Sequence, residues 1–302
     1  MQDIPKPSGG ILPKIKLLVK IAITIACLWY VFSKLNFREI WLALKSANWF
    51  WLLASLLIYS FSKVVGSRRL NIYFRNIGIQ LPEWQNLKLY WLGMFYNLFL
   101  PGAITGDAYK VILLSKKYSV PYKKTTTAVL LDRFSGLLAL GLIVAAYSTF
   151  VITERSYIIL MIGGALFAIP LLYFIIKKLF PDFLPGFWPT FILGAVVQIS
   201  VLLSVYFILF ALHITTDMNA YVFIFLIAVI ASVLPISVGG GLGVREFVII
   251  EGAKYAGLDQ HLALVLSLLF YIITVICSLT GMIFVFNDPL KSKTENQLKI
   301  NN

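Results

Sequence analysis

The chain has 302 residues, of which 60% are hydrophobic and 13% are charged, and its formal net charge is +13. The apolar residues form long blocks between short basic stretches. This pattern excludes a water-soluble domain, which would need more polar residues to cover its surface. The lysines and arginines lie at the block ends and form no stripe with interleaved aromatic residues, so we expect no nucleic-acid partner. Because a membrane-spanning segment must satisfy its own backbone, the blocks predict an all-α, polytopic integral membrane protein.

Taken in chain order, six apolar blocks are long enough to cross about 30 Å of hydrocarbon as helices. They are residues 17–32, 49–65, 125–150, 157–176, 189–212 and 262–286. Lys14, Lys16 and Lys20 form a positive flank before the apolar run to Phe32, but no A-x-A cleavage site follows, which favours an uncleaved helix over a signal peptide. The polar stretches are all short, so we expect a single membrane domain over residues 1–302, with a transmembrane core at 12–286 and a cytoplasmic tail at 287–302.

Two further apolar blocks, 87–114 and 221–250, are broken near their middle by proline and glycine, at residues 100–107 and 234–243. Each half is too short to cross the membrane comfortably. Basic residues precede and follow the first block, whereas few flank the second, so we expect both ends of each block to lie on one side. The sequence therefore predicts about six full spans and two re-entrant hairpins that enter from opposite faces.

The distribution of lysine and arginine predicts the orientation of these segments. With two re-entrant hairpins, 19 of the 26 basic residues lie inside and five lie outside, which places both termini in the cytoplasm. If both broken blocks instead cross as straight spans, residues 116–124 move outside, although they hold four lysines. The hairpin arrangement is therefore favoured.

Charged residues within or beside the apolar blocks are the candidates for function, because a charge at membrane depth is costly unless it is paired or hydrated. Asp132 and Arg133 lie near the start of one span, and Arg245 and Glu246 follow the glycine run of the second hairpin. Neighbouring residues on a helix do not face one another, so we expect each of these charges to find its partner elsewhere. Asp107, in the first hairpin, is a candidate partner for Arg133 or Arg245.

Two interpretations of these charges stay open. In the first, an ion pair with Asp107 pins the two broken helices together. In the second, the two arginines and the free backbone amides at a helix start form an anion site suited to a phosphate. The candidate substrate-binding residues are Arg133, Arg245, Asp107, Glu246, Asp132, Gly239, Gly240 and Gly241. Asp107 and Glu246 would then contact a cationic head group or carry a proton. Lys110 would meet an anionic lipid at the inner surface, or, as is favoured, would simply extend its ammonium to water at the interface.

No cofactor or metal site is expected from the sequence. Cys27 and Cys277 lie in apolar blocks without a CxxC pattern, and His213 and His261 lack the spacing of metal ligands. The glycine run lacks the third glycine and the preceding strand of a dinucleotide-binding fingerprint. We also assign no catalytic residue.

Three sequence stretches together resemble the flippase-like family, which is the family of the transmembrane region of lysylphosphatidylglycerol synthase. They are PGAITGDAYK at 101–110, LLDR at 130–133 and PISVGGGLGVRE at 235–246, within a resemblance that extends over roughly residues 12–286. The family's motif positions fall on Asp107, Asp132, Arg133, Arg245 and Glu246. Ala103 and Ile104 stand where the first motif of the family often has glycine. The resemblance implies a lipid-translocating protein of a prokaryotic cytoplasmic membrane.

Family members joined to a soluble aminoacyl-transferase domain make and move aminoacylated phosphatidylglycerol. No such domain is recognisable in this sequence, so the resemblance implies a transporter of a phospholipid or lipid-linked head group rather than an enzyme. Its expected partners are membrane lipids, in particular anionic or phosphate-bearing ones, with a second copy or another membrane protein left open. One alternative is a membrane enzyme of lipid or glycan modification, with Tyr109, Ser237 and Asp107 as candidate nucleophile or base. The other is a non-transporting assembly partner of another membrane protein.

Overall fold

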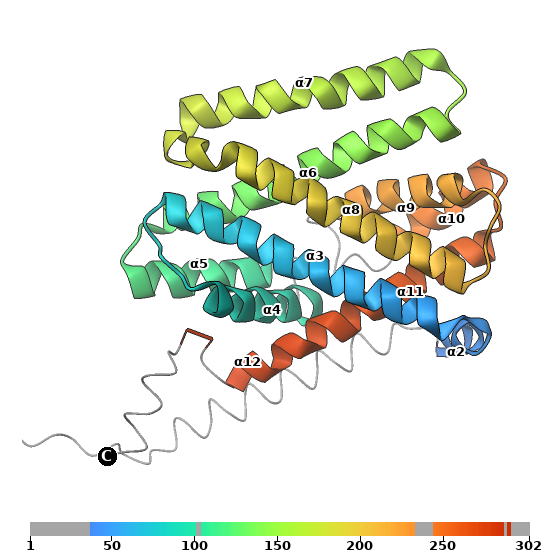
Figure 1. Cartoon of the computed structure of the whole chain (residues 1–302), viewed down its shortest axis with the longest axis horizontal. Coiled ribbons are helices and arrows are strands. Elements are labelled where there is room, and N and C mark those ends of the chain that lie inside the picture. Colours follow the sequence, from blue (N-terminus) through green and yellow to red (C-terminus); the bar gives the residue numbers. More distant parts are fainter. Residues whose placement is uncertain (1–36, 101–103, 233–243, 287–288, 291–302) are drawn as a thin grey trace, which may run out of the picture. The chain divides into compact units, whose positions relative to one another are not determined.

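The computed structural model describes residues 37–100, 104–232, 244–286 and 289–290, and every regular element among them is a helix (Figure 1). This confirms the predicted all-α class. The predicted first span, 17–32, and nearly all of the predicted tail lie outside the described residues. The described residues all belong to one compact unit, and all contacts given below lie within it.

The helices follow one another with short connections. Their bounds are α2 Phe37–Ser46, α3 Trp49–Asn76, α4 Glu83–Phe99, α5 Thr105–Tyr118, α6 Tyr122–Val151, α7 Arg155–Leu179, η1 Pro181–Gly186, α8 Phe187–Ala211, α9 Met218–Ser232, α10 Val244–Tyr255, α11 Gln260–Leu279, η2 Thr280–Met282 and α12 Ile283–Phe286. Five helical stretches are long and apolar enough to cross a membrane: α3, α6, α7, η1 with α8, and α11 through α12. They confirm the five predicted spans that fall on described residues.

Helix α3 is longer than predicted, because it continues past Val65 to Asn76. The added turns hold polar residues that resemble a loop in the sequence, yet Ser67, Arg69 and Asn71 are buried against neighbouring helices. The helix ends at Asn76, and two residues later Gly78 has a φ of +83°, a left-handed conformation that favours glycine. The basic residues of this segment therefore lie on a helix and not in a connecting loop.

Contacts between helix termini define two ends of the bundle. At the first, the end of α3 meets η1 through Asn76 Nδ2 and the Phe183 carbonyl oxygen at 3.4 Å, and the start of α6 meets η1 through Lys124 and Asp182 at 2.8 Å. This end, called the basic end below, carries Lys116, Lys117, Lys123, Lys124, Lys177 and Lys178 at its helix termini. At the opposite end, the backbone amide of Asn48 donates to the Ala211 carbonyl oxygen at 2.9 Å, which joins the start of α3 to the end of α8.

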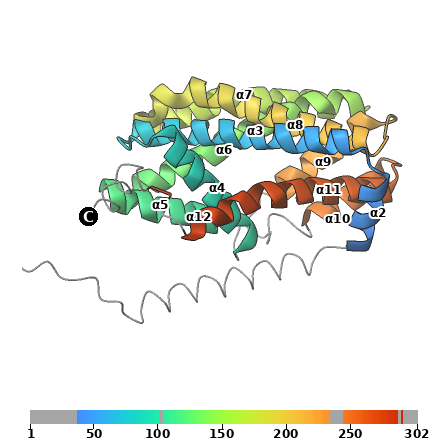
Figure 2. The ribbon, with the colours of Figure 1, turned by 60° about the horizontal axis from the view of Figure 1, so that its bottom comes forward.

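The two predicted broken blocks are pairs of packed helices at different ends of the bundle (Figures 1 and 2). The start of α4 lies beside the end of α3, where Arg75 and Glu83 form an ion pair. The end of its partner α5 lies beside the start of α6, where Ser115 Oγ donates to Thr125 Oγ1 at 2.9 Å. Both termini of the α4–α5 pair therefore lie at the basic end.

The α9–α10 pair has the reverse placement, with both of its outer termini at the opposite end. Asn219, at the start of α9, accepts a hydrogen bond from Tyr206 Oη at 2.8 Å, and Tyr206 lies near the end of α8. Tyr221 Oη donates to the carbonyl oxygen of Asp259, just after α10, at 3.5 Å. The segments that join the halves, 101–103 and 233–243, lie outside the described residues.

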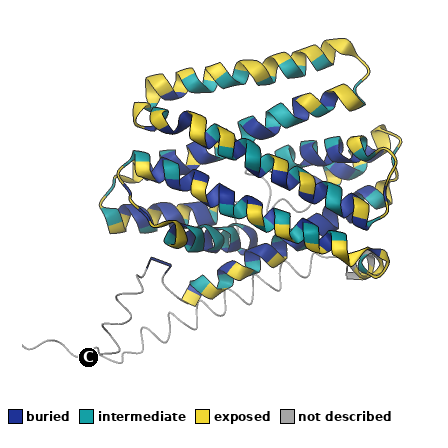
Figure 3. Cartoon of the chain, viewed as in Figure 1, coloured by how far each residue is buried: buried dark blue, intermediate teal, exposed yellow. Residues whose placement is uncertain are grey.

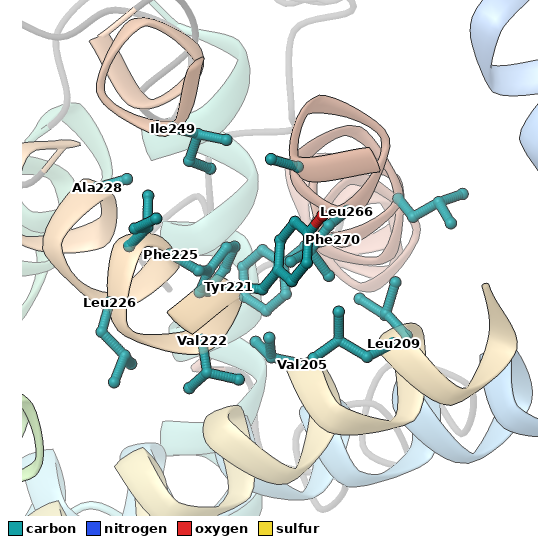
Figure 4. Close-up of a cluster of buried hydrophobic side chains, with 14 of the residues drawn as sticks. Val205, Leu209, Tyr221, Val222, Phe225, Leu226, Ala228, Ile249, Leu266 and Phe270 are labelled. Atoms are coloured by element: carbon teal, nitrogen blue, oxygen red, sulfur yellow. The ribbon is translucent and has the colours of Figure 1, made fainter. Parts of the chain in front are cut away.

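The larger apolar core lies between α8, α9, α10 and α11, where Phe225 and Phe270 meet with ring centroids 4.8 Å apart (Figure 4). A second core joins α3 through α6 near the basic end. Helix α7 contributes almost nothing to either, because Ile176 is its only buried residue (Figure 3). Its apolar side chains are suited to contact with lipid.

Candidate functional site

The first candidate cluster joins the α4–α5 pair to α6 through Asp107. Asp107 lies in the first turn of α5, and its Oδ2 accepts from Arg133 Nε at 2.6 Å. Its Oδ1 accepts from Lys110 Nζ at 3.0 Å, one turn along the same helix. The predicted partnership of Asp107 with Arg133 is confirmed. Two cations thus share one carboxylate, which leaves the cluster with an excess positive charge.

Lys110 is a full member of this cluster, and the expectation that its ammonium reaches interfacial water is wrong. Lys110 is 4% exposed, and its Nζ lies 4.8 Å from the centre of the Tyr90 ring on α4. The side chain passes directly over Gly93, where any larger residue would collide with it. The close approach of α4 and α5 therefore encloses the lysine that the sequence pattern placed at the membrane surface.

Close backbone contact holds this helix pair together. The backbone of Gly93 on α4 lies against Gly106 on α5, and a Cβ atom at Gly106 would overlap the Gly93 backbone. The amide of Gly106 donates to Asn97 Oδ1 at 2.7 Å, which satisfies one of the free amides at the start of α5. This contact fixes Asp107, the next residue, in its position beside α6.

A pocket of about 230 Å³ opens beside Arg133 between α5 and α6. Its walls are mainly apolar and include Ile104, Ile112, Val129 and Leu130. The Arg133 side chain is 29% exposed, whereas those of Asp107 and Lys110 are 13% and 5% exposed. Arg133 is therefore the member of the cluster that an incoming ligand would meet first, at the edge of an apolar surface.

The second cluster pairs Asp132 with Arg69. Arg69 Nε donates to Asp132 Oδ1 at 2.7 Å and Nη2 donates to Oδ2 at 3.1 Å, so the carboxylate is held by both arms of the guanidinium. Both residues are buried. Asp132 and Arg133 thus find partners on different helices, as predicted, and α6 is fixed to α3 by one residue and to α5 by the next.

The third cluster lies at the start of α10. Arg245 Nη2 donates to Glu246 Oε1 at 3.0 Å, Arg245 Nε donates to Ser267 Oγ at 2.9 Å, and Ser267 Oγ donates to Glu246 Oε1 at 3.1 Å. The expectation that Arg245 and Glu246 cannot pair is wrong. Both belong to the first turn of α10, and their long side chains converge on Ser267 of α11.

The predicted joint anion site is not assembled among the described residues. Arg133 binds a carboxylate on α5, whereas Arg245 binds residues of α10 and α11, and in the described ranges the two clusters share no member. Gly239, Gly240 and Gly241 lie outside the described residues, as does Ser237. The contribution of the glycine run to an anion site stays a prediction.

Comparison with known protein families gives a match that covers part of this chain. The family model described as the lysylphosphatidylglycerol synthase TM region matches residues 17–185. The chain belongs to this family. A comparison with curated proteins gives no match.

Within the chain, the part that matches the lysylphosphatidylglycerol synthase TM region contains the first and second clusters entirely, together with the predicted first two motifs. The third motif and the Arg245 cluster lie beyond the matched residues, so the match is shorter than the predicted 12–286. The membrane-spanning helices and the family agree on a multi-pass membrane protein with a lipid-related role.

Arg69 and Tyr90 are site residues that the sequence pattern did not identify. The signal for Arg69 was the lack of proline and glycine between Val65 and Asn76 apart from Gly66, which allows α3 to continue with Arg69 on an inner face. Tyr90 carries no such signal, because tyrosine within an apolar helix is common at membrane interfaces. Tyr109, a candidate nucleophile in the sequence, stacks edge-on with Tyr96 at 5.0 Å.

Proposed function

We propose that this protein moves a phospholipid or lipid-linked head group across the membrane and that Arg133 binds its phosphate. The observation that carries the proposal is the excess positive charge of the Asp107–Lys110–Arg133 cluster beside an apolar pocket. A positive charge at membrane depth is costly, and an anionic ligand would compensate for it. The membership in a lipid-related family supports the same class of ligand.

The pocket matches the two parts of a lipid. Its apolar walls suit an acyl or prenyl chain, while Arg133 offers guanidinium N–H groups that bind phosphate oxygens in pairs. Both oxygens of Asp107 already accept bonds from cations, which favours binding over a role for Asp107 as a free catalytic base. The Asp107–Arg133 pair joins α5 to α6 and not the two broken blocks to each other, and such a pair is compatible with phosphate binding by Arg133.

We further propose that α4–α5 and α9–α10 are re-entrant hairpins and that the basic end faces the cytoplasm. The two pairs have their outer termini at different ends of the bundle, and lysine gathers at one of these ends. Arg69 and Lys110 are buried in ion pairs, so they are not signals of topology. The excess of lysine and arginine on the cytoplasmic side remains when these two residues are left out. In a prokaryotic cytoplasmic membrane this orientation places both termini inside.

Single cysteines placed in or beside the outer halves of these helices test this topology. Lys88→Cys on α4 and Lys117→Cys on α5 are expected to react with an impermeant maleimide only from the cytoplasmic side, and Asp217→Cys and Lys254→Cys only from outside. The measurement is labelling in intact cells and in inverted vesicles, in a background without Cys27 and Cys277. Opposite labelling of Lys88→Cys and Lys117→Cys would show that α4 and α5 cross the membrane as a straight span.

Replacing Arg133 tests the transport function. Arg133→Ala is expected to reduce the initial rate of lipid movement by about tenfold or more, because it removes the charge-assisted bond to phosphate. The measurement is the movement of labelled phospholipids and polyprenyl-phosphate lipids in liposomes that contain purified protein. Lys124→Ala is the matched control, since Lys124 is a 52% exposed cation on the same helix and binds only Asp182 among the described residues. It should leave the rate within about twofold of wild type.

The possible outcomes separate the alternatives. Equal rates for Arg133→Ala and wild type would exclude Arg133 as the phosphate ligand. No movement of any lipid by folded wild-type protein would favour the enzyme or assembly-partner interpretation.

A further inference from the structure

Helix α2 crosses the end of the bundle instead of running along it. In both views of the ribbon, α2 runs across the direction of α3 and α11 (Figures 1 and 2). Ala47 and Asn48 connect it to α3 at the end opposite the basic end, where Asn48 bonds to Ala211. Leu44 of α2 packs against the larger apolar core. One side of α2 is thus attached to the bundle at a point where the spanning helices end.

The outer side of α2 combines cations with apolar side chains. Its members are three, four and seven positions from Arg38, which places them on one face of a helix: Arg38, Trp41, Leu42 and Lys45. All four are exposed, Trp41 by 68% and Leu42 by 56%. No ion pair of the described residues includes Arg38 or Lys45. The outer face of α2 therefore presents two cations beside a large apolar surface.

The length of α3 places α2 at the level of the lipid head groups. Helix α3 has 28 residues and is roughly 42 Å long, and a bilayer with its head groups is about 40–45 Å thick. An apolar stripe on α3 is 50–70% exposed and is suited to contact with lipid; it consists of Phe50, Leu53, Leu57 and Phe61. The stripe begins in the first turn of α3, so the lipid beside it extends to the end of the bundle where α2 lies.

The chemistry of the outer face fits anionic phospholipids. Tryptophan favours the boundary between head groups and acyl chains, and long basic side chains beside it bind phosphate oxygens. Arg38 and Lys45 lie roughly 10 Å apart along the helix, one turn to either side of Trp41. They are also two of the five basic residues that the hairpin arrangement places outside, where the orientation rule disfavours lysine and arginine. Binding of anionic head groups would give these two cations a role at that surface.

We propose that α2 is an interfacial helix whose outer face binds the phosphate groups of anionic phospholipids. Arg38 and Lys45 bind the phosphates, and Trp41 lies between them at the boundary of head groups and acyl chains. The ligand is a lipid and not a free anion, because acyl chains would cover the apolar surface of Trp41 and Leu42. The proposal goes beyond lipid movement and does not depend on it, because a lipid bound at α2 need not be transported.

Quenching of Trp41 fluorescence by brominated lipids tests the proposal, since bromine on an acyl chain quenches indole on contact. The full-length protein is placed in nanodiscs of equal parts phosphatidylcholine and phosphatidylglycerol, with bromine on the chains of one lipid or the other. Subtracting the signal of Trp41→Phe from that of wild type isolates the Trp41 component. Brominated phosphatidylglycerol is expected to quench this component about threefold or more strongly than brominated phosphatidylcholine, because two cations beside Trp41 attract anionic head groups.

Paired substitutions show whether the two cations cause this preference. Arg38→Gln with Lys45→Gln is expected to remove it, so that both brominated lipids quench Trp41 equally. Arg155→Gln with Lys254→Gln is the matched control, since it also removes one exposed arginine and one exposed lysine at the same end, from α7 and α10. The control should keep the preference of wild type. Raising the salt concentration should weaken the wild-type preference, because salt screens exposed charges.

Equal quenching by the two brominated lipids in wild type would overturn the proposal, as would a preference that Arg38→Gln with Lys45→Gln retains. If neither lipid quenches the Trp41 component, a second copy or another protein covers α2 in place of lipid, and the proposal is rejected. Folding of each variant is checked by gel filtration and circular dichroism. If the Arg38→Gln, Lys45→Gln variant does not fold, the wild-type preference must fall with salt for the proposal to stand. Wild-type protein that moves no lipid yet prefers phosphatidylglycerol at Trp41 would reject the proposed transport and support the binding at α2.

Discussion

Asp132→Ala is expected to lower the free energy of unfolding by about 3–5 kcal/mol, because it leaves the Arg69 guanidinium buried without a counter-charge. The two side chains form a double hydrogen bond at 2.7 and 3.1 Å, and Arg69 Nη1 already has no partner among the described residues. No nearby carboxylate in the described ranges could replace Asp132, since Asp107 is held by Lys110 and Arg133. The measurement is reversible unfolding in mixed micelles with increasing dodecyl sulfate, followed by circular dichroism.

Two controls distinguish this effect from a general loss of charge. Asp182→Ala breaks an exposed ion pair with Lys124 and should cost no more than about 1 kcal/mol. The double variant Arg69→Met with Asp132→Leu removes both charges and should recover most of the stability, because an apolar pair needs no desolvation of ions. If Asp132→Ala is as mild as Asp182→Ala, water or lipid head groups reach Arg69 and the pair is not a buried clamp.

Gly106→Ala is expected to disrupt the α4–α5 pair and to cost about 3 kcal/mol or more. The added methyl group would overlap backbone atoms of Gly93, which cannot rotate away as a side chain could. The helices would separate, and Lys110 would lose its enclosure beside Tyr90. Unfolding in dodecyl sulfate measures the stability, and the liposome assay measures whether lipid movement is lost with it.

Gly141→Ala provides the matched control for this substitution. Gly141 lies within α6, and nothing stands within 4 Å of the position that its Cβ would take. Since alanine favours a helix over glycine, this variant should be as stable as wild type or more stable by up to about 1 kcal/mol. Equal stability of Gly106→Ala and Gly141→Ala would show that α4 and α5 are less closely packed than described.

Most of the fold could be predicted from the sequence, because a segment that spans a membrane must have an apolar composition that is easy to recognise. An apolar block of about 20 residues has few alternatives to a helix in lipid, so the five described spans followed directly. Pro101 and the glycines near it predicted a break at this point. In the structure, α4 ends at Phe99 and α5 begins at Thr105. The end of α3 was missed because buried polar residues look like a loop when their partners on other helices are unknown.

The candidate site was only partly predictable for a related reason. Asp107, Asp132 and Arg133 were identified as charges that need partners, but nothing in the spacing shows that Arg69 lies 63 positions before Asp132 as its partner. The burial of Lys110 depends on the backbone contact between Gly93 and Gly106, which is a tertiary property. An Arg245–Glu246 pair was excluded because neighbouring side chains point in different directions from a helix. In the structure, both side chains bend toward a third residue, Ser267, and Glu246 Oε1 accepts from Arg245 and from Ser267.

The Arg69–Asp132 pair also has a consequence for the order in which the protein is made. Among the five candidate spans, α3 emerges from the ribosome first, and it is the least apolar of them. At about 5–20 residues per second, Asp132 follows Arg69 by roughly 3–13 s, since 63 positions separate them. During this interval Lys63 and Arg69 lack the helices that enclose them, so α3 is poorly suited to enter lipid alone. Helix α7, which carries no charge between Arg155 and Lys177, has no such dependence. We therefore expect the stable insertion of α3 to wait for the synthesis of α6.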